Sequence, residues 1–241
     1  MKVEIWSDIA CPWCYVGKAR FEKALDAFPH RDQVEVVHRS FELDPGRAKG
    51  DVQPVITMLT KKYGMSAAQA QAGEENLGTQ AAAEGLEYRT RDRDHGNTFD
   101  MHRLLHLAKD QGRQDALIQA LYRANFAEER SLFTEGDERL VELAVAAGLA
   151  AEDARRVLAD QAAYAEEVRA DEREAAELGA NGVPFFVLDR KFGVSGAQPA
   201  EVFTQALTQA WGERSPLKLI DEGAAGGAEA CGPDGCAVPQ H

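Results

Sequence analysis

The fold is decided by the first stretch of the chain, residues 2–14, which reads KVEIWSDIACPWC. Val3 and Ile5 alternate with polar or aromatic neighbours, and such alternation is typical of a half-buried β-strand. Pro12 then stands where the first residue of a helix is expected, because proline is favoured at that position. The sequence therefore predicts a strand that leads directly into a helix, with two cysteines at the junction.

The next segment extends this start into a β-α-β unit. Apolar residues recur at helical spacing up to Phe28, and Pro29 ends the helix. Residues 33–41, QVEVVHRSF, alternate and are rich in β-branched side chains, which predicts a second strand. Strands joined through a helix pair in parallel. We assign residues 1–50 to the first half of a thioredoxin-type domain.

The middle and the end of the chain have different patterns. Residues 51–178 show only helical periodicity, with a capping box at Ser66 and Gln69 and a charged loop at 85–97, and they are predicted to form an inserted helical domain. Residues 179–214 contain a strand, a tight turn, a second strand and a helix, and form the second half of the thioredoxin domain. The predicted class is α/β, a thioredoxin fold interrupted by helices, followed by a flexible tail at 215–241.

Charge and hydropathy exclude several classes of partner. The 241 residues include 40 acidic and 27 basic side chains, a formal net charge of −13. Such a chain repels phosphate backbones and anionic lipid surfaces, so we expect neither a nucleic-acid nor a membrane partner. No apolar run approaches the roughly 20 residues of a membrane span, and the first residues lack the apolar region of a signal peptide. We therefore expect a cytoplasmic protein.

The chemistry is expected at Cys11 and Cys14. Close cysteine pairs in a cytoplasmic protein indicate redox or metal chemistry. Cys11 lies at the start of a helix, where free N–H groups and the helix dipole stabilise a thiolate. We expect Cys11 to be the exposed nucleophile and Cys14, inside the first turn, to be the shielded resolving thiol. Trp13 is expected to contact the substrate. Zinc held by all four cysteines is the alternative, but the helix that follows favours redox chemistry and no metal.

The dipeptide Val183-Pro184 begins a predicted strand. A cis bond there would turn the backbone of Val183 toward Cys11, where it could pair with an extended substrate. A trans proline that simply starts the strand is equally compatible with the bare sequence.

Other polar residues have competing interpretations. Asp8 either accepts a proton from Cys14 or is a turn residue at the end of the strand. His102 and His106 have the spacing of two metal ligands, but without a third ligand we favour helix packing or a groove lining. His38 is expected in the sheet, and the alternating arginines of the loop, Arg89, Arg91 and Arg93, are expected in solvent.

Several motifs together resemble the DsbA-like thioredoxin superfamily, and more closely its FrnE-like branch. The resemblance covers residues 1–212 and rests on CPWC at 11–14, FELDP at 41–45, Asn97-Thr98 followed by HRL at 102–104, Gly182-Val183-Pro184, and SGAQP at 195–199.

The resemblance implies a thiol–disulfide oxidoreductase that oxidises, reduces or isomerises protein disulfides. Cys11 would be the nucleophile, Cys14 the resolving thiol and Pro184 a cis residue, with Pro12, Trp13 and Val183 beside the substrate. The redox-active disulfide needs no separate cofactor. Expected partners are proteins with disulfides or dithiols, with glutathione or a thioredoxin-type protein for recycling. The alternative is a glutathione-dependent isomerase or transferase that acts on an aromatic small molecule, although such proteins as a rule carry serine at one of the two cysteine positions.

A second cysteine pair lies in the tail, within the segment CGPDGC at 231–236. The turn signal Pro-Asp-Gly favours a disulfide between Cys231 and Cys236. A tethered dithiol has a high effective concentration at a nearby site. The hypothesis is that this pair exchanges with Cys11 and Cys14, and the alternative is an incidental tail disulfide.

Overall fold

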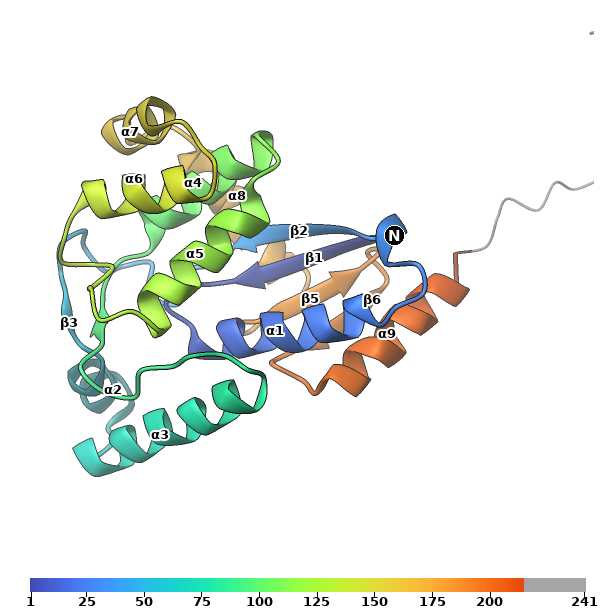
Figure 1. Cartoon of the computed structure of the whole chain (residues 1–241), viewed down its shortest axis with the longest axis horizontal. Helices are drawn as coiled ribbons and strands as arrows, with labels where there is room; N and C mark the ends of the chain where they lie inside the picture. Colours follow the sequence, from blue (N-terminus) through green and yellow to red (C-terminus); the bar gives the residue numbers. More distant parts are fainter. Residues whose placement is uncertain (215–241) are drawn as a thin grey trace, which may run out of the picture.

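The computed structural model describes residues 1–214, and the tail at 215–241 lies outside the described residues. The chain opens with β1 (Lys2–Ser7), α1 (Pro12–Asp26), a short 3-10 turn η1 (Arg31–Gln33) and β2 (Glu35–Ser40). It closes with β5 (Phe185–Leu188), β6 (Phe192–Ser195) and α9 (Ala200–Gly212). These two segments build one mixed sheet in the order β2-β1-β5-β6 (Figure 1). The order β-α-β followed by β-β-α is that of the predicted thioredoxin fold.

The register of the sheet confirms the predicted strand directions. β1 and β2 are parallel, with Ile5 opposite His38, while β5 is antiparallel to both β1 and β6. α1 and α9 run side by side over one face of the sheet (Figure 1). The carboxyl end of β1 points toward the remaining helices, so the turn that carries the CPWC pair faces them.

Between β2 and β5 the chain forms seven helices and two very short strands. The helices are α2 (Val55–Tyr63), α3 (Ala67–Ala83), α4 (Phe99–Asp110), α5 (Gln114–Phe126), α6 (Asp137–Ala146), α7 (Ala151–Ala159) and α8 (Ala165–Glu177). The predicted capping box is present at the start of α3, where Ser66 and Gln69 bond each other's backbone N–H groups.

The prediction that this region is entirely helical was wrong in one place. β3 (Gln53–Pro54) and β4 (Asp94–His95) pair in antiparallel fashion. β4 lies within the segment that the sequence predicts to be a charged loop. Its two polar residues show no strand periodicity, and their pairing depends on Gln53, which is far away in the sequence. The α7 helix, at 151–159, was not predicted as a separate element from the sequence.

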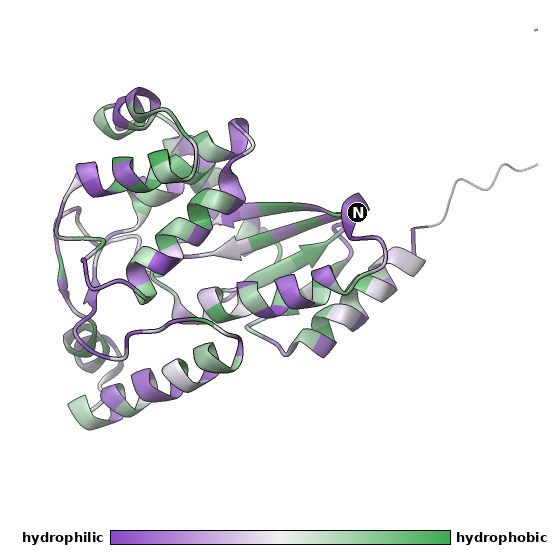
Figure 2. Ribbon diagram, in the orientation of Figure 1, coloured by the Kyte–Doolittle hydropathy of each residue, from purple (hydrophilic) through white to green (hydrophobic). Residues whose placement is uncertain are grey.

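Two large hydrophobic clusters and a smaller third one around Trp6 hold the described residues together, and Figure 2 shows β5 in the green of hydrophobic residues. One cluster fills the space between the sheet and α1 with α9. The other lies among α4, α5, α6 and α7, and it includes Cys11, Cys14 and Tyr15 from the start of α1. The first half of α1 therefore packs against the inserted helices and its second half against the sheet.

α1 passes very close to the loop before β5 at Gly17. A Cβ added there would lie 2.9 Å from Cγ of Pro184 and 3.3 Å from Cα of Ala197. These distances are shorter than ordinary van der Waals contacts, so the absence of a side chain at Gly17 lets the helix approach Pro184.

We predict that Gly17→Ala destabilises the protein, although alanine is the better helix former by about 1 kcal/mol. Overpacking of this kind costs about 1–3 kcal/mol, which outweighs the gain in propensity. Urea or thermal unfolding measures the change. The matched control is Gly73→Ala in α3, where an added Cβ meets nothing within 4 Å, and this variant should be slightly more stable than the wild type. Equal stabilisation by both substitutions would contradict the close approach.

Candidate active site

Cys11 is the N-cap residue of α1. Its backbone is extended, with φ −89° and ψ 110°, and Pro12 is the first helical residue. The carbonyl of Cys11 accepts hydrogen bonds from the backbone N–H groups of Cys14 and Tyr15, at 3.0 and 3.4 Å. The first turn carries no acidic residue. Cys11 thus stands at the N-terminal, positive end of the dipole of α1.

Both thiols are free and buried, with exposed fractions of 4% for Cys11 and 2% for Cys14. The prediction that Cys11 is exposed at the surface was therefore wrong. The physical reason is that α2 and α3 stand beside the start of α1, so Cys11 opens into a cavity of about 450 Å³. Among the described residues, Cys11 lines this cavity and Cys14 does not. Cys11 is therefore the cysteine of this pair that faces the cavity.

The two thiols differ in their surroundings. Burial raises the pKa of the Cys14 thiol well above its usual range, and the hydrogen bond and charge of Cys11 raise it further. Cys14 therefore holds its proton at neutral pH. A buried thiol that keeps its proton is a poor first nucleophile.

Val183 and Pro184 lie directly beside Cys11. The peptide bond between them is cis, which is the geometry that the family resemblance implies. The Sγ atom of Cys11 donates to the carbonyl oxygen of Val183 at 3.6 Å. Val183 also lines the cavity, as do Pro12 and Trp13, and the Trp13 side chain is 38% exposed. The structure thus brings all three predicted substrate-binding residues to the opening around Cys11.

Asp8 forms a buried polar site behind the cysteines. Its Oδ2 accepts a hydrogen bond from the backbone N–H of Leu43 at 2.7 Å, and its Oδ1 lies 3.2 Å from the N–H of Ala10 and 3.4 Å from Nε2 of His102. Burial acts to raise the pKa of Asp8, but the hydrogen bonds from His102, Leu43 and Thr98 outweigh it and hold the pKa below its usual value. Asp8 is therefore an ionised carboxylate and more than a turn residue.

His102 and His106 serve different partners. His106 Nε2 lies 3.1 Å from Oδ2 of Asp171 and 3.2 Å from Oγ of Ser40, while His102 turns to Asp8. The two rings therefore do not converge on one point. Within residues 1–214 no group of three His, Cys, Asp or Glu side chains is arranged to hold a metal ion.

Arg93 does not lie in solvent, so the prediction for this part of the loop was wrong. It is 6% exposed, and its guanidinium lies 4.9 Å from the ring centre of Tyr88 and 5.0 Å from that of Phe126. It also pairs with the buried Glu74. Alternating arginine and acidic residues are equally typical of an exposed loop, so the sequence pattern did not indicate that Arg93 is buried. The pairing of β4 with β3 turns this segment toward the interior.

The sequence did not predict that Arg93 and His95 form part of the cavity wall. Arg93 and His95 flank Asp94 at β4, and both line the cavity with Cys11. The rest of the wall is mostly apolar and comes from α2 and α3, including Met58, Leu59 and Leu77. A largely apolar cavity with a few polar groups is the usual form of a small-ligand site.

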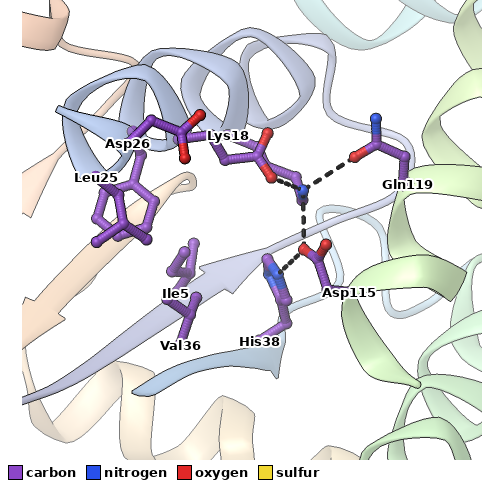
Figure 3. Close-up of a pocket in the computed structure, with 10 residues that line it drawn as sticks. Ile5, Lys18, Leu25, Asp26, Val36, His38, Asp115 and Gln119 are labelled. Atoms are coloured by element: carbon purple, nitrogen blue, oxygen red, sulfur yellow. Dashed lines mark hydrogen bonds and ion pairs between the residues drawn. The ribbon is translucent and has the colours of Figure 1, made fainter. Parts of the chain in front are cut away.

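A second cavity, of about 430 Å³, lies between α1, α5 and the sheet (Figure 3). Ile5 and Val36 contribute apolar surface there, and the buried His38 lies 3.5 Å from Asp115. Lys18 Nζ reaches Asp115 at 2.9 Å and Gln119 at 3.2 Å. Figure 3 shows these polar groups directed toward one another. The cluster ties α1 to α5, and neither of the two described cysteines, Cys11 and Cys14, lines this cavity.

Cys231 and Cys236 lie outside the described residues, so the structure does not test the predicted tail pair. In the described part of the chain, no helix combines the length and the apolar character that crossing a membrane requires.

Comparisons with known proteins agree with this architecture. The solved structure of a probable DsbA oxidoreductase, SCO1869 of Streptomyces coelicolor, is 81% identical in sequence, covers 100% of both chains and superposes with a TM-score of 0.89. A 2-hydroxychromene-2-carboxylate isomerase is 18% identical, with a TM-score of 0.64 over 87% of this chain and 95% of its own. The cytosolic disulfide reductase DsbM of Pseudomonas aeruginosa is 20% identical, with a TM-score of 0.59 over 87% and 98%.

The last two likenesses show a shared fold alone, since their sequences have diverged so far. The sequence match to a known family is broader. Residues 2–208 match the family described as DSBA-like thioredoxin domain, which spans both halves of the sheet and every inserted helix. With the fold, the CPWC junction and the 81% identical relative, this match establishes that the chain belongs to the DSBA-like thioredoxin family.

Proposed function

We propose that the protein is a thiol–disulfide oxidoreductase in which Cys11 is the nucleophile and Cys14 the resolving thiol. One observation carries the proposal: Cys11 caps α1, opens into the cavity and touches the carbonyl of Val183, while the protonated Cys14 lies behind it. The 81% identical relative is described as a probable DsbA oxidoreductase, which supports the same reaction class.

In the reducing direction the Cys11 thiolate attacks one sulfur of a substrate disulfide. That S–S bond breaks, a mixed disulfide with Cys11 forms, and the departing substrate thiolate takes a proton. Cys14 then loses its proton and attacks Cys11 Sγ, which releases the second substrate thiol and leaves a Cys11–Cys14 disulfide. Two electrons have passed to the substrate. The oxidising direction is the reverse sequence.

Substrates and recycling partners are part of the same proposal. Proteins with disulfides or dithiols are the substrates, and glutathione is a candidate recycling thiol. DsbM of Pseudomonas aeruginosa, which shares the fold, has been solved with GSH, and the cavity beside Cys11 has the volume for a molecule of that size. A cytoplasmic location and the FrnE-like branch stay expectations from the sequence.

A glutathione-dependent isomerase is the second candidate, because an isomerase of that general fold is among the similar structures. In that reaction the cavity would hold glutathione and Cys14 would be dispensable. The presence of both cysteines favours the oxidoreductase.

Cys11→Ser should abolish disulfide reduction, whereas Cys14→Ser should still attack once and accumulate a mixed disulfide. The reason is that only Cys11 opens into the cavity and only Cys14 can resolve the intermediate. Turnover of a disulfide-linked fluorescent peptide measures the loss, and mass spectrometry of the intact protein detects the trapped adduct. Full turnover by Cys14→Ser would contradict the role of Cys14 as the resolving thiol.

The Cys11–Cys14 pair should have a reduction potential between about −120 and −270 mV, the range of working exchange catalysts. Equilibration in graded glutathione buffers, followed by thiol trapping, measures it. A disulfide that stays closed below about −300 mV would mark the pair as structural.

The tail pair is proposed to exchange with Cys11 and Cys14, and the end of the described chain makes this sterically feasible. Trp211 near the end of α9 packs on Phe28, just beyond the carboxyl end of α1, with ring centres 5.8 Å apart. Since α1 has 15 residues, this point is about 22 Å along the helix from Cys11. The roughly 17 residues from Arg214 to Cys231 can span up to about 60 Å.

Replacing both Cys231 and Cys236 by serine should slow the steady-state turnover of a protein disulfide. The potential of Cys11 and Cys14 should not change, because the tail acts as a tethered exchange partner and not as part of the buried site. The comparison uses full-length protein with each single serine variant as a control. An unchanged rate in the double variant would refute the exchange.

A further inference from the structure

His95 is a buried titratable side chain that the exchange steps above do not use. It lies in β4, opposite Gln53 of β3, so backbone pairing fixes its position. The side chain lines the Cys11 cavity and is 6% exposed. The presence of a histidine in a mostly apolar cavity that Cys11 also lines requires a physical explanation.

The Nε2 atom of His95 has no hydrogen-bond partner within residues 1–214. The Oδ2 atom of Asp44 lies 3.8 Å away, too far for a hydrogen bond. Other polar groups of the wall are already engaged: Arg93 pairs with Glu74, and Asn125 donates to the carbonyl of Ile9 at 2.8 Å. A buried polar atom without a partner is costly, and a substrate group in the cavity would satisfy it.

The charges around His95 keep the ring neutral. Burial lowers the pKa of His95, and the nearby Arg47 and Lys62 lower it further. Asp8 and Asp44 act in the opposite direction without reversing the shift. The other charged groups of this part of the wall, Arg93 and Glu74, neutralise each other, and Asp94 precedes His95 in β4. A neutral imidazole accepts a proton.

We propose that His95 is the base that removes the proton from an incoming thiol substrate in the Cys11 cavity. This inference rests on the proposed function and assigns to the site a specific substrate form, the un-ionised thiol. Thiols of ordinary acidity are mostly protonated at pH 7, and only the thiolate attacks a disulfide. A base in the cavity that Cys11 lines would therefore remove the barrier that limits such substrates.

In the proposed step a thiol RSH reacts with the oxidised protein. The proton moves from sulfur to Nε2 of His95, and the thiolate attacks Sγ of Cys11. The Cys11–Cys14 bond breaks, and its electron pair goes to Cys14, which takes up a proton. The products are the mixed disulfide of R with Cys11 and the Cys14 thiol. The imidazolium of His95 returns its proton to solvent.

The test compares two thiols in stopped-flow reactions with the oxidised full-length protein at pH 7. 2-Mercaptoethanol is un-ionised at this pH, whereas 2-nitro-5-thiobenzoate is already a thiolate and needs no base. In His95→Gln, the rate constant for 2-mercaptoethanol should fall about 10-fold or more, and that for 2-nitro-5-thiobenzoate should change by less than about two-fold. Equal slowing of both thiols, or of neither, would overturn the proposal.

The matched control is His38→Gln. His38 is also a buried histidine, but its Nε2 lies 3.5 Å from Asp115 at the second cavity, which neither Cys11 nor Cys14 lines. This variant should leave both rate constants within about two-fold of the wild type if the effect belongs to the Cys11 cavity. A selective loss for 2-mercaptoethanol in His38→Gln as well would count against His95.

The pH profile of the wild type tests the same point without a variant. With a base of lowered pKa, the logarithm of the rate constant for 2-mercaptoethanol should level off above that pKa and rise again only as the thiol itself ionises. A slope of one throughout this range would mean that free thiolate alone reacts, and would refute the role of His95. Failure of the proposed function would give a different result. If Cys11 were not the reacting cysteine, Cys11→Ser would react with 2-nitro-5-thiobenzoate as fast as the wild type.

Discussion

The packing of α1 into two different cores is the constraint on which the site depends. The start of the helix, with Cys11, Cys14 and Tyr15, belongs to the cluster of inserted helices, while Phe21 and Phe28 belong to the cluster over the sheet. A helix is stiff over 15 residues, so fixing its far half against the sheet also fixes the sulfur at its N-terminus. The close approach at Gly17 then sets the distance between the helix and the loop of Pro184. The contact between Cys11 and Val183, which are 172 positions apart, is a consequence of that packing.

The same arrangement makes the two thiols chemically unequal. Cys14 is enclosed on all sides, and the lost hydration of its thiolate raises its pKa. Cys11 is shielded from bulk solvent, but it lies at the N-terminus of α1 and opens into the cavity. Behind them, Asp8 is kept ionised by hydrogen bonds in a place where burial alone would neutralise it. The fixed negative charge of Asp8 opposes a second one on Cys14 and so helps to keep the pKa of the Cys14 thiol raised.

The parts of this picture that follow from sequence are those with a local cause. The alternation in β1, the proline after Cys11 and the capping box at Ser66 are each set by a few neighbouring residues, and the helix and strands appear where these patterns place them. The burial of Cys11, the ion pair of Arg93 and the position of His95 depend on contacts between segments far apart in the chain. A two-residue strand such as β4 has no periodicity to detect. Local patterns therefore predict where the sulfurs are, and tertiary pairing decides what surrounds them.

The thioredoxin segment and the insertion contribute different parts of the site. The reacting sulfur and the Val183 carbonyl come from the two halves of the thioredoxin segment, whereas most of the cavity wall, including Met58, Leu77, Arg93 and His95, comes from the insertion between them. In the proposed function, the thioredoxin segment sets the place of thiol exchange at Cys11, because it holds the helix N-terminus and the adjacent carbonyl. In the proposed reaction, the insertion selects the thiol or disulfide that approaches Cys11, and His95 acts on its protonation state. Changes in the insertion can thus alter substrate choice while the packing of α1, and with it the exchange chemistry, is preserved.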